Sequence, residues 1–306
     1  MRRIIILSKT YVLENITDLC SDNGMKKPEF RLTEIKASMR FWWRALNYYK
    51  DRKEMKSNED RIFGNADKIK SPIMLRLLNN INEFTDGAVA KKGHIVKISK
   101  KGVSCIKRFD PCKQVEIELS LYKRRMDKLI YTDKKLDYYS NLLEISLVLG
   151  GIGKRSRRGC GVFYLIENGN GEFSYKTLYE NIKNNMKNLN VDQYYSFSDD
   201  EDKQYLTIIR CDNYKGLDYP YIEEINLSKK TIDVSEFYQK IKQAIDRCRN
   251  ENVFYKYGDN YRLACPTYVT CYGRNDNCLY PIIVKLHNTS GCDDKKYYSI
   301  FKEVLL

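Results

Sequence analysis

Four basic side chains lie within five positions of a glycine-rich segment, Gly150 to Gly161. The cations are Lys154, Arg155, Arg157 and Arg158, and the glycines that flank them are Gly150, Gly151, Gly153, Gly159 and Gly161. Glycine permits positive φ and a close approach of the backbone, so successive N–H groups can form an anion-binding nest, while Lys and Arg neutralise phosphate. The segment predicts a phosphate-binding loop. Taken alone, it fits a glycine turn with a solvated basic tip equally well.

The distribution of charge favours a polyanion as partner. The chain has 54 Lys+Arg and 40 Asp+Glu, a net charge of +14. Residues 1–170 hold 35 basic and 20 acidic residues, whereas residues 171–306 hold 19 and 20. Binding to nucleic acid explains this segregation, because neutralised phosphates release their counterions. A membrane-surface role is disfavoured, since no long basic amphipathic helix is evident, and we expect the near-neutral second half to contact other proteins.

Length and composition indicate a folded protein of two domains, which we place at residues 1–170 and 171–306. There is no run of 18 apolar residues, and the opening apolar segment is too short for a signal peptide, so we expect a cytoplasmic protein. The ten cysteines are then reduced thiols. Their spacing is loose for zinc and the chain has two histidines, so neither a metal nor a cofactor is expected.

Hydrophobic periodicity predicts an α+β fold class. In the first half it indicates strands and helices in the order of a ferredoxin-like (RRM-like) domain, an antiparallel sheet covered on one face by two helices: strands at 3–12, 74–78, 115–121 and 162–166, helices at 34–48 and 136–149. The second half repeats the plan, with strands at 205–211, 264–272 and 280–286 and helices at 235–248 and 295–305. The sequence therefore predicts two tandem ferredoxin-like domains with antiparallel sheets. Segments 50–58 and 199–202 are expected to be exposed loops.

The helix predicted at 34–48, capped by Thr33, has two distinct faces. At 100° per residue its core stripe consists of Ile35, Met39, Trp42 and Leu46, and a second arc carries Lys36, Arg40, Arg44 and Asn47, with Trp43 at the border. We expect Lys36, Arg40, Trp43 and Arg44 to contact RNA. The alternative is that both tryptophans are core residues and the arginines are merely solvated, and for Trp42 the core position is favoured.

Three groups of motifs resemble one family. Residues 31–46, followed by Ile62-Phe63-Gly64-Asn65 and Lys70-Ser71-Pro72, resemble the N-terminal signature of the first-numbered RAMP subunit of the Cmr module, the type III-B CRISPR effector. The spacing Gly151-x-Gly153-x5-Gly159-x-Gly161 is similar to the glycine-rich loop of RAMP proteins generally. Residues 262–266 and 280–283 are similar to that subunit's C-terminal motifs, with Cys265 where a serine is more usual.

This resemblance implies an RNA-binding subunit without catalytic residues, in an antiviral ribonucleoprotein. Its partners would be the guide (CRISPR) RNA, near its 3′ part, the target RNA, and the other RAMP subunits of the Cmr module. Target cleavage in such complexes belongs to the repeated backbone subunit. The residues that the resemblance carries over as RNA contacts are Arg40, Trp43 and Arg44 of the helix, Lys154 to Arg158 of the loop, and Lys70 and Arg262.

Other functions fit less well. Repeat-processing CRISPR endoribonucleases share the glycine loop and often use a histidine, but their loop lies near the C-terminus, whereas 145 residues follow Gly161 here. His94 and His287 are more simply surface or structural residues. A Walker loop would need glycine at Val148 and Ser or Thr at Arg155, and a dinucleotide fingerprint would need glycine at Ser156. The chain also lacks the aromatic signature string that is typical of a free-standing RRM-type RNA binder.

Overall fold

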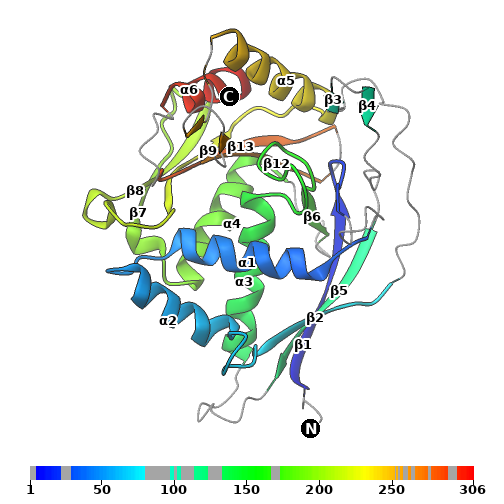
Figure 1. The fold of residues 1–306 in the computed structure, drawn as a ribbon, viewed down its shortest axis with the longest axis vertical. Coiled ribbons are helices and arrows are strands. Elements are labelled where there is room, and N and C mark those ends of the chain that lie inside the picture. Colours follow the sequence, from blue (N-terminus) through cyan, green and yellow to red (C-terminus); the bar gives the residue numbers. More distant parts are fainter. Residues whose placement is uncertain are drawn as a thin grey trace.

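Two antiparallel sheets, one from each half of the chain, organise the fold (Figure 1). The computed structural model describes residues 5–21, 29–79, 97–99, 102–104, 114–122, 133–166, 173–251, 253, 256–257, 261–262, 266–274, 277–288 and 295–306. Two short antiparallel hairpins are not part of either sheet. In one, β3 (Lys97–Ser99) pairs with β4 (Gly102–Ser104), and in the other, β10 (Lys256–Tyr257) pairs with β11 (Tyr261–Arg262). The predicted domain boundary at residue 170 stays a prediction, because residues 167–172 lie outside the described part.

The first sheet has the strand order β2-β5-β1-β6, formed by β1 (Ile5–Asn15), β2 (Ile73–Leu77), β5 (Gln114–Tyr122) and β6 (Phe163–Ile166). The strand β5 alternates as its sequence predicts, with Val115 and Ile117 buried and Glu116 exposed. Two helices pack together, α1 (Leu32–Leu46) and α3 (Asp133–Leu149). The strands of this sheet and the helices α1 and α3 follow the order strand, helix, two strands, helix and strand, with α2 and the β3–β4 hairpin inserted. This order confirms the ferredoxin-like plan of the first half.

The second sheet has the order β12-β13-β9-β8-β7. Its strands are β7 (Tyr195–Ser198), β8 (Tyr205–Arg210), β9 (Ile222–Ser228), β12 (Thr267–Tyr272) and β13 (Tyr280–Leu286), and short 3₁₀ helices span Asp192–Tyr194 and Asp212–Tyr214. The helices α5 (Val234–Asn250) and α6 (Lys295–Leu305) pack against each other at one end of the molecule (Figure 1). In a ferredoxin-like domain the fourth strand lies beside the first strand. Here β8 lies beside β9 in that position, although β8 precedes β9 in the sequence.

Two helices differ from the sequence prediction. Residues 50–58, expected as a loop, belong mostly to α2 (Arg52–Phe63), and α4 (Tyr175–Asn188) was not predicted. The α2 helix begins with a reciprocal cap, because Asp51 Oδ1 accepts from the N–H of Glu54 at 2.8 Å and Glu54 Oε2 accepts from the N–H of Lys50 at 3.0 Å. The predicted Thr33 cap is wrong: α1 begins at Leu32, two residues before the predicted start at Glu34, and its first turn closes on the carbonyl of Arg31.

The two halves share one connected hydrophobic core. The ring of Trp42 in α1 meets that of Tyr268 in β12 edge to face at 5.0 Å, and α3 packs against both α4 and β12. The guanidinium of Arg210, at the end of β8, donates to the carbonyl of Asn47 just past α1 at 2.8 Å. Within the described residues, no helix has both the length and the apolar composition needed to span a bilayer.

Candidate nucleic-acid interface

The glycine loop, residues 150–161, joins α3 to β6 in a conformation that depends on its glycines. Gly153, Gly159 and Gly161 have φ of +80°, +72° and +69°, and Arg155 also takes a positive φ of +63°. A Cβ on Gly161 would overlap the carbonyl oxygen of Ile152. The two arms of the loop are joined there, since the N–H of Ile152 donates to the carbonyl of Gly161 at 2.8 Å. The loop therefore has a fixed shape before any ligand binds.

Several backbone N–H groups of the loop donate within the protein. Lys154 N–H donates to the carbonyl of Cys20 at 2.8 Å, and Gly161 N–H donates to the carbonyl of Asp18 at 2.9 Å. The N–H groups of Arg158 and Cys160 both point to the carbonyl of Arg155, at 2.8 and 3.4 Å. These groups are not available to form the anion-binding nest that the sequence suggested. A phosphate at this loop would be bound mainly by the side chains of the tip.

The loop also packs against the second half of the chain. Arg158 forms a parallel bridge to Val269 of β12, and the N–H of Val269 donates to the carbonyl of Arg157 at 3.1 Å. A Cβ on Gly159 would press on the ring of Phe237 in α5, so the backbone touches that helix directly. Burial raises the pKa of the neighbouring Cys160 thiol to about 12, so this cysteine stays protonated near neutral pH. The loop is thus held by both halves.

The four cations of the loop reach the surface to different degrees. Lys154 and Arg158 are exposed, whereas Arg155 and Arg157 are partly buried. The guanidinium of Arg157 lies 5.0 Å from the ring centre of Tyr268 in β12. The ring of Tyr268 in turn lies 5.3 Å from that of Phe41 in α1, at an interplanar angle of 32°. Sequence reasoning had not selected Phe41 or Tyr268, which connect the loop to the first helix.

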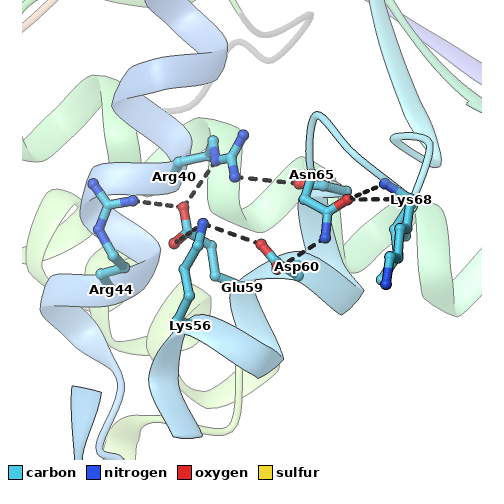
Figure 2. A network of polar contacts seen from close by, with 9 residues as sticks. Arg40, Arg44, Lys56, Glu59, Asp60, Asn65 and Lys68 are labelled. Carbon is cyan, nitrogen blue, oxygen red and sulfur yellow. Dashed lines mark hydrogen bonds and ion pairs between the residues drawn. The ribbon is translucent and has the colours of Figure 1, made fainter. Parts of the chain in front are cut away.

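The two arginines of α1 share a buried carboxylate. Arg40 Nε and Arg44 Nη1 contact the same oxygen of Glu59, Oε1, at 2.9 and 2.6 Å, and the Glu59 side chain is 4% exposed (Figure 2). Lys56 lies 3.6 Å from the other oxygen of Glu59 and 3.1 Å from Asp60. Hydrogen bonds from Asn65 and Lys56 hold the pKa of Asp60 below its usual range. Two carboxylates thus offset most of the charge of the three cations.

Lys36 and Trp43 have structural partners. Lys36 Nζ donates to Ser71 Oγ at 2.6 Å and to the carbonyl of Ile73 at 3.3 Å, which ties α1 to the start of β2. Trp43 is 2% exposed, and its Nε1 donates to the hydroxyl of Tyr138 in α3 at 2.8 Å. Trp42 is buried as well. Both tryptophans are therefore core residues in this structure, and the expected contact between Trp43 and RNA does not fit its burial.

The remaining candidates are spread over the surface or lie beyond the described side chains. Lys70 is exposed in the segment before β2. The backbone of Arg262 is in β11, and its side chain lies outside the described part, as does His94. His287 stacks on Tyr221 with ring centres 4.6 Å apart, and its Nδ1 lies 2.9 Å from Glu223 Oε1. Among the described residues, no cluster of three His, Cys, Asp or Glu side chains is arranged to hold a metal ion.

The structure therefore brings the loop, α1 and β12 together through Arg157, Tyr268 and Phe41, while Lys36, Arg40 and Arg44 face α2 and the start of β2. Glu59, which positions both α1 arginines, was missed because α2 was missed. The reciprocal pattern Asp51-x-x-Glu54 is a sequence signal that would have placed this helix. At 100° per residue Phe41 lies outside the core stripe, on the flank of α1 opposite Trp43, so an aromatic side chain at the surface could have been selected there.

Comparisons with known proteins agree with this architecture. A family model described as the RAMP superfamily matches residues 14–164. The CRISPR system Cmr subunit Cmr1-1 of Pyrococcus furiosus is 27% identical over 170 residues, which are 52% of this chain and 45% of that protein. The aligned region is thus less than half the length of that curated relative.

Solved structures match over nearly the whole chain. The crystal structure of Cmr1 from Pyrococcus furiosus in its apo form aligns with a TM-score of 0.56 and 15% identity, covering 98% of this chain and 97% of the other. A chain from the cryo-EM structure of Type III-B Cmr-beta bound to cognate target RNA aligns with a TM-score of 0.59 and 13% identity, covering 99% and 100%. At these identities the likeness shows a common fold. The match over residues 14–164, just under half of the chain, confirms the resemblance to the RAMP superfamily that the sequence predicted.

Proposed function

We propose that this protein is a non-catalytic RNA-binding subunit of a type III-B (Cmr) CRISPR ribonucleoprotein effector. Its glycine loop contacts phosphates of the RNA. These belong to the 3′ part of the guide RNA, to the target RNA, or to both. The other RAMP subunits of the module are its protein partners, and the near-neutral residues 171–306 supply much of that interface. The resemblance to Cmr1 in sequence and fold supports a place in a Cmr complex. One of the matching chains comes from a Type III-B Cmr-beta complex bound to cognate target RNA, which supports RNA as a partner.

The observation that carries the RNA-binding role is the exposed, rigid tip of the glycine loop. Lys154 and Arg158 are exposed there, and the backbone around them is fixed by hydrogen bonds to Cys20, Asp18 and β12. Because the backbone is already fixed, binding a phosphate chain orders only the two side chains and not the loop that carries them. Arg40 and Arg44 supply a weaker, partly neutralised positive surface, since both are bound to Glu59. We therefore rank the loop above α1 as the site of phosphate contact.

Reversing the two exposed loop charges tests this function. The variant Lys154→Glu/Arg158→Glu is expected to bind single-stranded RNA about tenfold or more weakly at low salt, for all sequences alike. The log–log slope of affinity against salt concentration should become less negative by roughly 0.7 for each phosphate that the loop no longer neutralises. Fluorescence anisotropy with labelled RNA at a series of salt concentrations measures both quantities.

The matched control is Lys176→Glu/Lys242→Glu, which makes the same change of charge at two exposed lysines of α4 and α5. This control should retain the affinity and the slope of the unmodified protein. Circular dichroism must show that both variants are folded. Equal losses of affinity in the two variants would reduce the effect to net charge, and an unchanged loop variant would contradict the proposed function.

A second expectation concerns catalysis. The purified chain is expected to leave labelled repeat RNA and target RNA intact, with or without Mg²⁺ or Mn²⁺. The reason is that His287 is bound to Glu223 and stacked on Tyr221, which are contacts of a structural residue. Gel electrophoresis over several hours measures the result. Cleavage abolished by His94→Ala or His287→Ala would instead support the endoribonuclease alternative.

A further inference from the structure

We propose that Phe41 is a stacking site for one unpaired base of the bound RNA, backed by Tyr268 and Arg157. This inference rests on the proposed function and adds a base contact to a site otherwise built for phosphates. The site lies where three segments meet: α1 supplies Phe41, β12 supplies Tyr268, and the glycine loop supplies Arg157. It therefore combines both halves of the chain.

The geometry of the aromatic group fixes the orientation of Phe41. Its ring lies 5.3 Å from that of Tyr268 and 5.0 Å from that of Trp42, the second contact being edge to face at 80°. Trp42 and Tyr268 are buried, whereas Phe41 is partly exposed. Two fixed neighbours thus hold an aromatic ring at the surface, so little side-chain freedom is lost when a flat ligand stacks on it.

The surface beside Phe41 is suited to a base. A helical side chain leans toward the helix N-terminus and lies over the preceding turn, which here carries Ala37 and Ser38. Both side chains are small, and Ala37 is exposed, so they leave space for a flat ring next to Phe41. The adjacent loop carries Arg157 against Tyr268, followed by the exposed Arg158, so the phosphates on either side of a stacked base would meet cations.

A nucleobase is the ligand that fits this combination of chemistry. Single-stranded nucleic acid binds to surfaces that combine aromatic rings for the bases with cations for the backbone, and stacking tolerates any base because every base has a π-face. Trp43, the aromatic residue expected to contact RNA, is buried and hydrogen-bonded to Tyr138. Phe41 is the neighbouring aromatic side chain of the same helix that is partly exposed beside the loop.

The test separates base contacts from phosphate contacts. Phe41→Leu keeps an apolar side chain against Tyr268 and removes the ring, and it is expected to weaken single-stranded RNA binding about fivefold or more without changing the salt slope. Inorganic polyphosphate, a polyanion without bases, should bind this variant as it binds the unmodified protein. Phe41→Trp, which restores a π-face, should recover the affinity for RNA. Phe197→Leu, the same change at a partly buried residue of β7, is the control and should have no effect.

The outcomes distinguish this inference from the proposed function. Unchanged RNA affinity in Phe41→Leu, or equal losses of affinity for RNA and polyphosphate, would overturn the stacking site. In the second case the substitution would have disturbed the cationic loop itself. If the variant with both loop charges reversed also binds RNA normally, the proposed function fails as well. Selective loss of RNA binding, with rescue by Phe41→Trp, supports the site.

Discussion

Arg210→Met is expected to lower the free energy of unfolding by about 3–5 kcal/mol, because several buried acceptors lose a charged donor, at about 1–3 kcal/mol for each group left unsatisfied. Arg210 is fully buried at the end of β8. Its guanidinium donates to the carbonyls of Tyr214 and Asn47, at 2.9 and 2.8 Å, and to the hydroxyl of Tyr195 at 2.8 Å. It also lies 4.8 Å from the ring centre of Tyr221.

The position of this cation explains the size of the effect. Arg210 also approaches the carbonyls of Ala45 and Leu46, at 3.4 and 3.5 Å, so it neutralises the C-terminal end of α1, where the helix dipole is negative. Methionine fills much of the same volume but donates no hydrogen bond. The carbonyls of Tyr214 and Asn47 then lose this donor, while the Tyr195 hydroxyl still donates to those of Ala45 and Leu46. Since α1 belongs to the first half and β8 to the second, the contact between the halves is weakened.

Urea denaturation followed by tryptophan fluorescence measures this destabilisation, because both tryptophans lie in α1. The control is Arg247→Met in α5, where the arginine is 42% exposed and paired with Glu251 and Glu303. An exposed pair of this kind contributes less than about 1 kcal/mol. Equal midpoints for the two variants would show that Arg210 does not hold the halves together.

How much of the fold the sequence predicts depends on the range of the interactions involved. The stripe of Ile35, Met39, Trp42 and Leu46 is buried as its 3.6-residue period required, and the helix 295–305 agrees with α6. Period and propensity are local, so such elements can be read from the chain. The α2 helix was missed because nearly all of its residues are polar. Its start is nevertheless encoded locally, in the capping residues Asp51 and Glu54.

The candidate site was predictable in position but not in its contacts. The glycine loop lies after α3 and before β6 as predicted, yet its N–H groups bind the carbonyls of Asp18 and Cys20, more than a hundred residues earlier. Nothing local in the loop indicates those partners. In the same way, charge periodicity identified Arg40 and Arg44, but the buried Glu59 that binds both comes from a separate helix. Long-range pairing therefore decides which cations remain for RNA.

Gly161→Ala is expected to lower the free energy of unfolding by about 2–5 kcal/mol, from two separate causes. A positive φ of +69° costs an alanine roughly 1–2 kcal/mol. The added Cβ would overlap the carbonyl of Ile152, and relieving such an overlap by moving the backbone costs about 1–3 kcal/mol more. Gly216→Ala separates the causes, because its φ is +78° and no atom lies within 4 Å of a Cβ there. That control should show the conformational cost alone in urea denaturation, and equal destabilisation of both variants would contradict the overlap.

The same substitution should impair RNA binding at temperatures where the variant remains folded. Gly161 accepts from the N–H of Ile152 and donates to the carbonyl of Asp18, so a shift of its backbone moves both arms of the loop. The backbone positions of Lys154 and Arg158 would then no longer be fixed, and binding would have to restore them. We expect weaker RNA binding in Gly161→Ala and unchanged binding in Gly216→Ala, measured by anisotropy at low temperature. Normal affinity in a folded Gly161→Ala variant would mean that the rigid shape of the loop is not what RNA recognises.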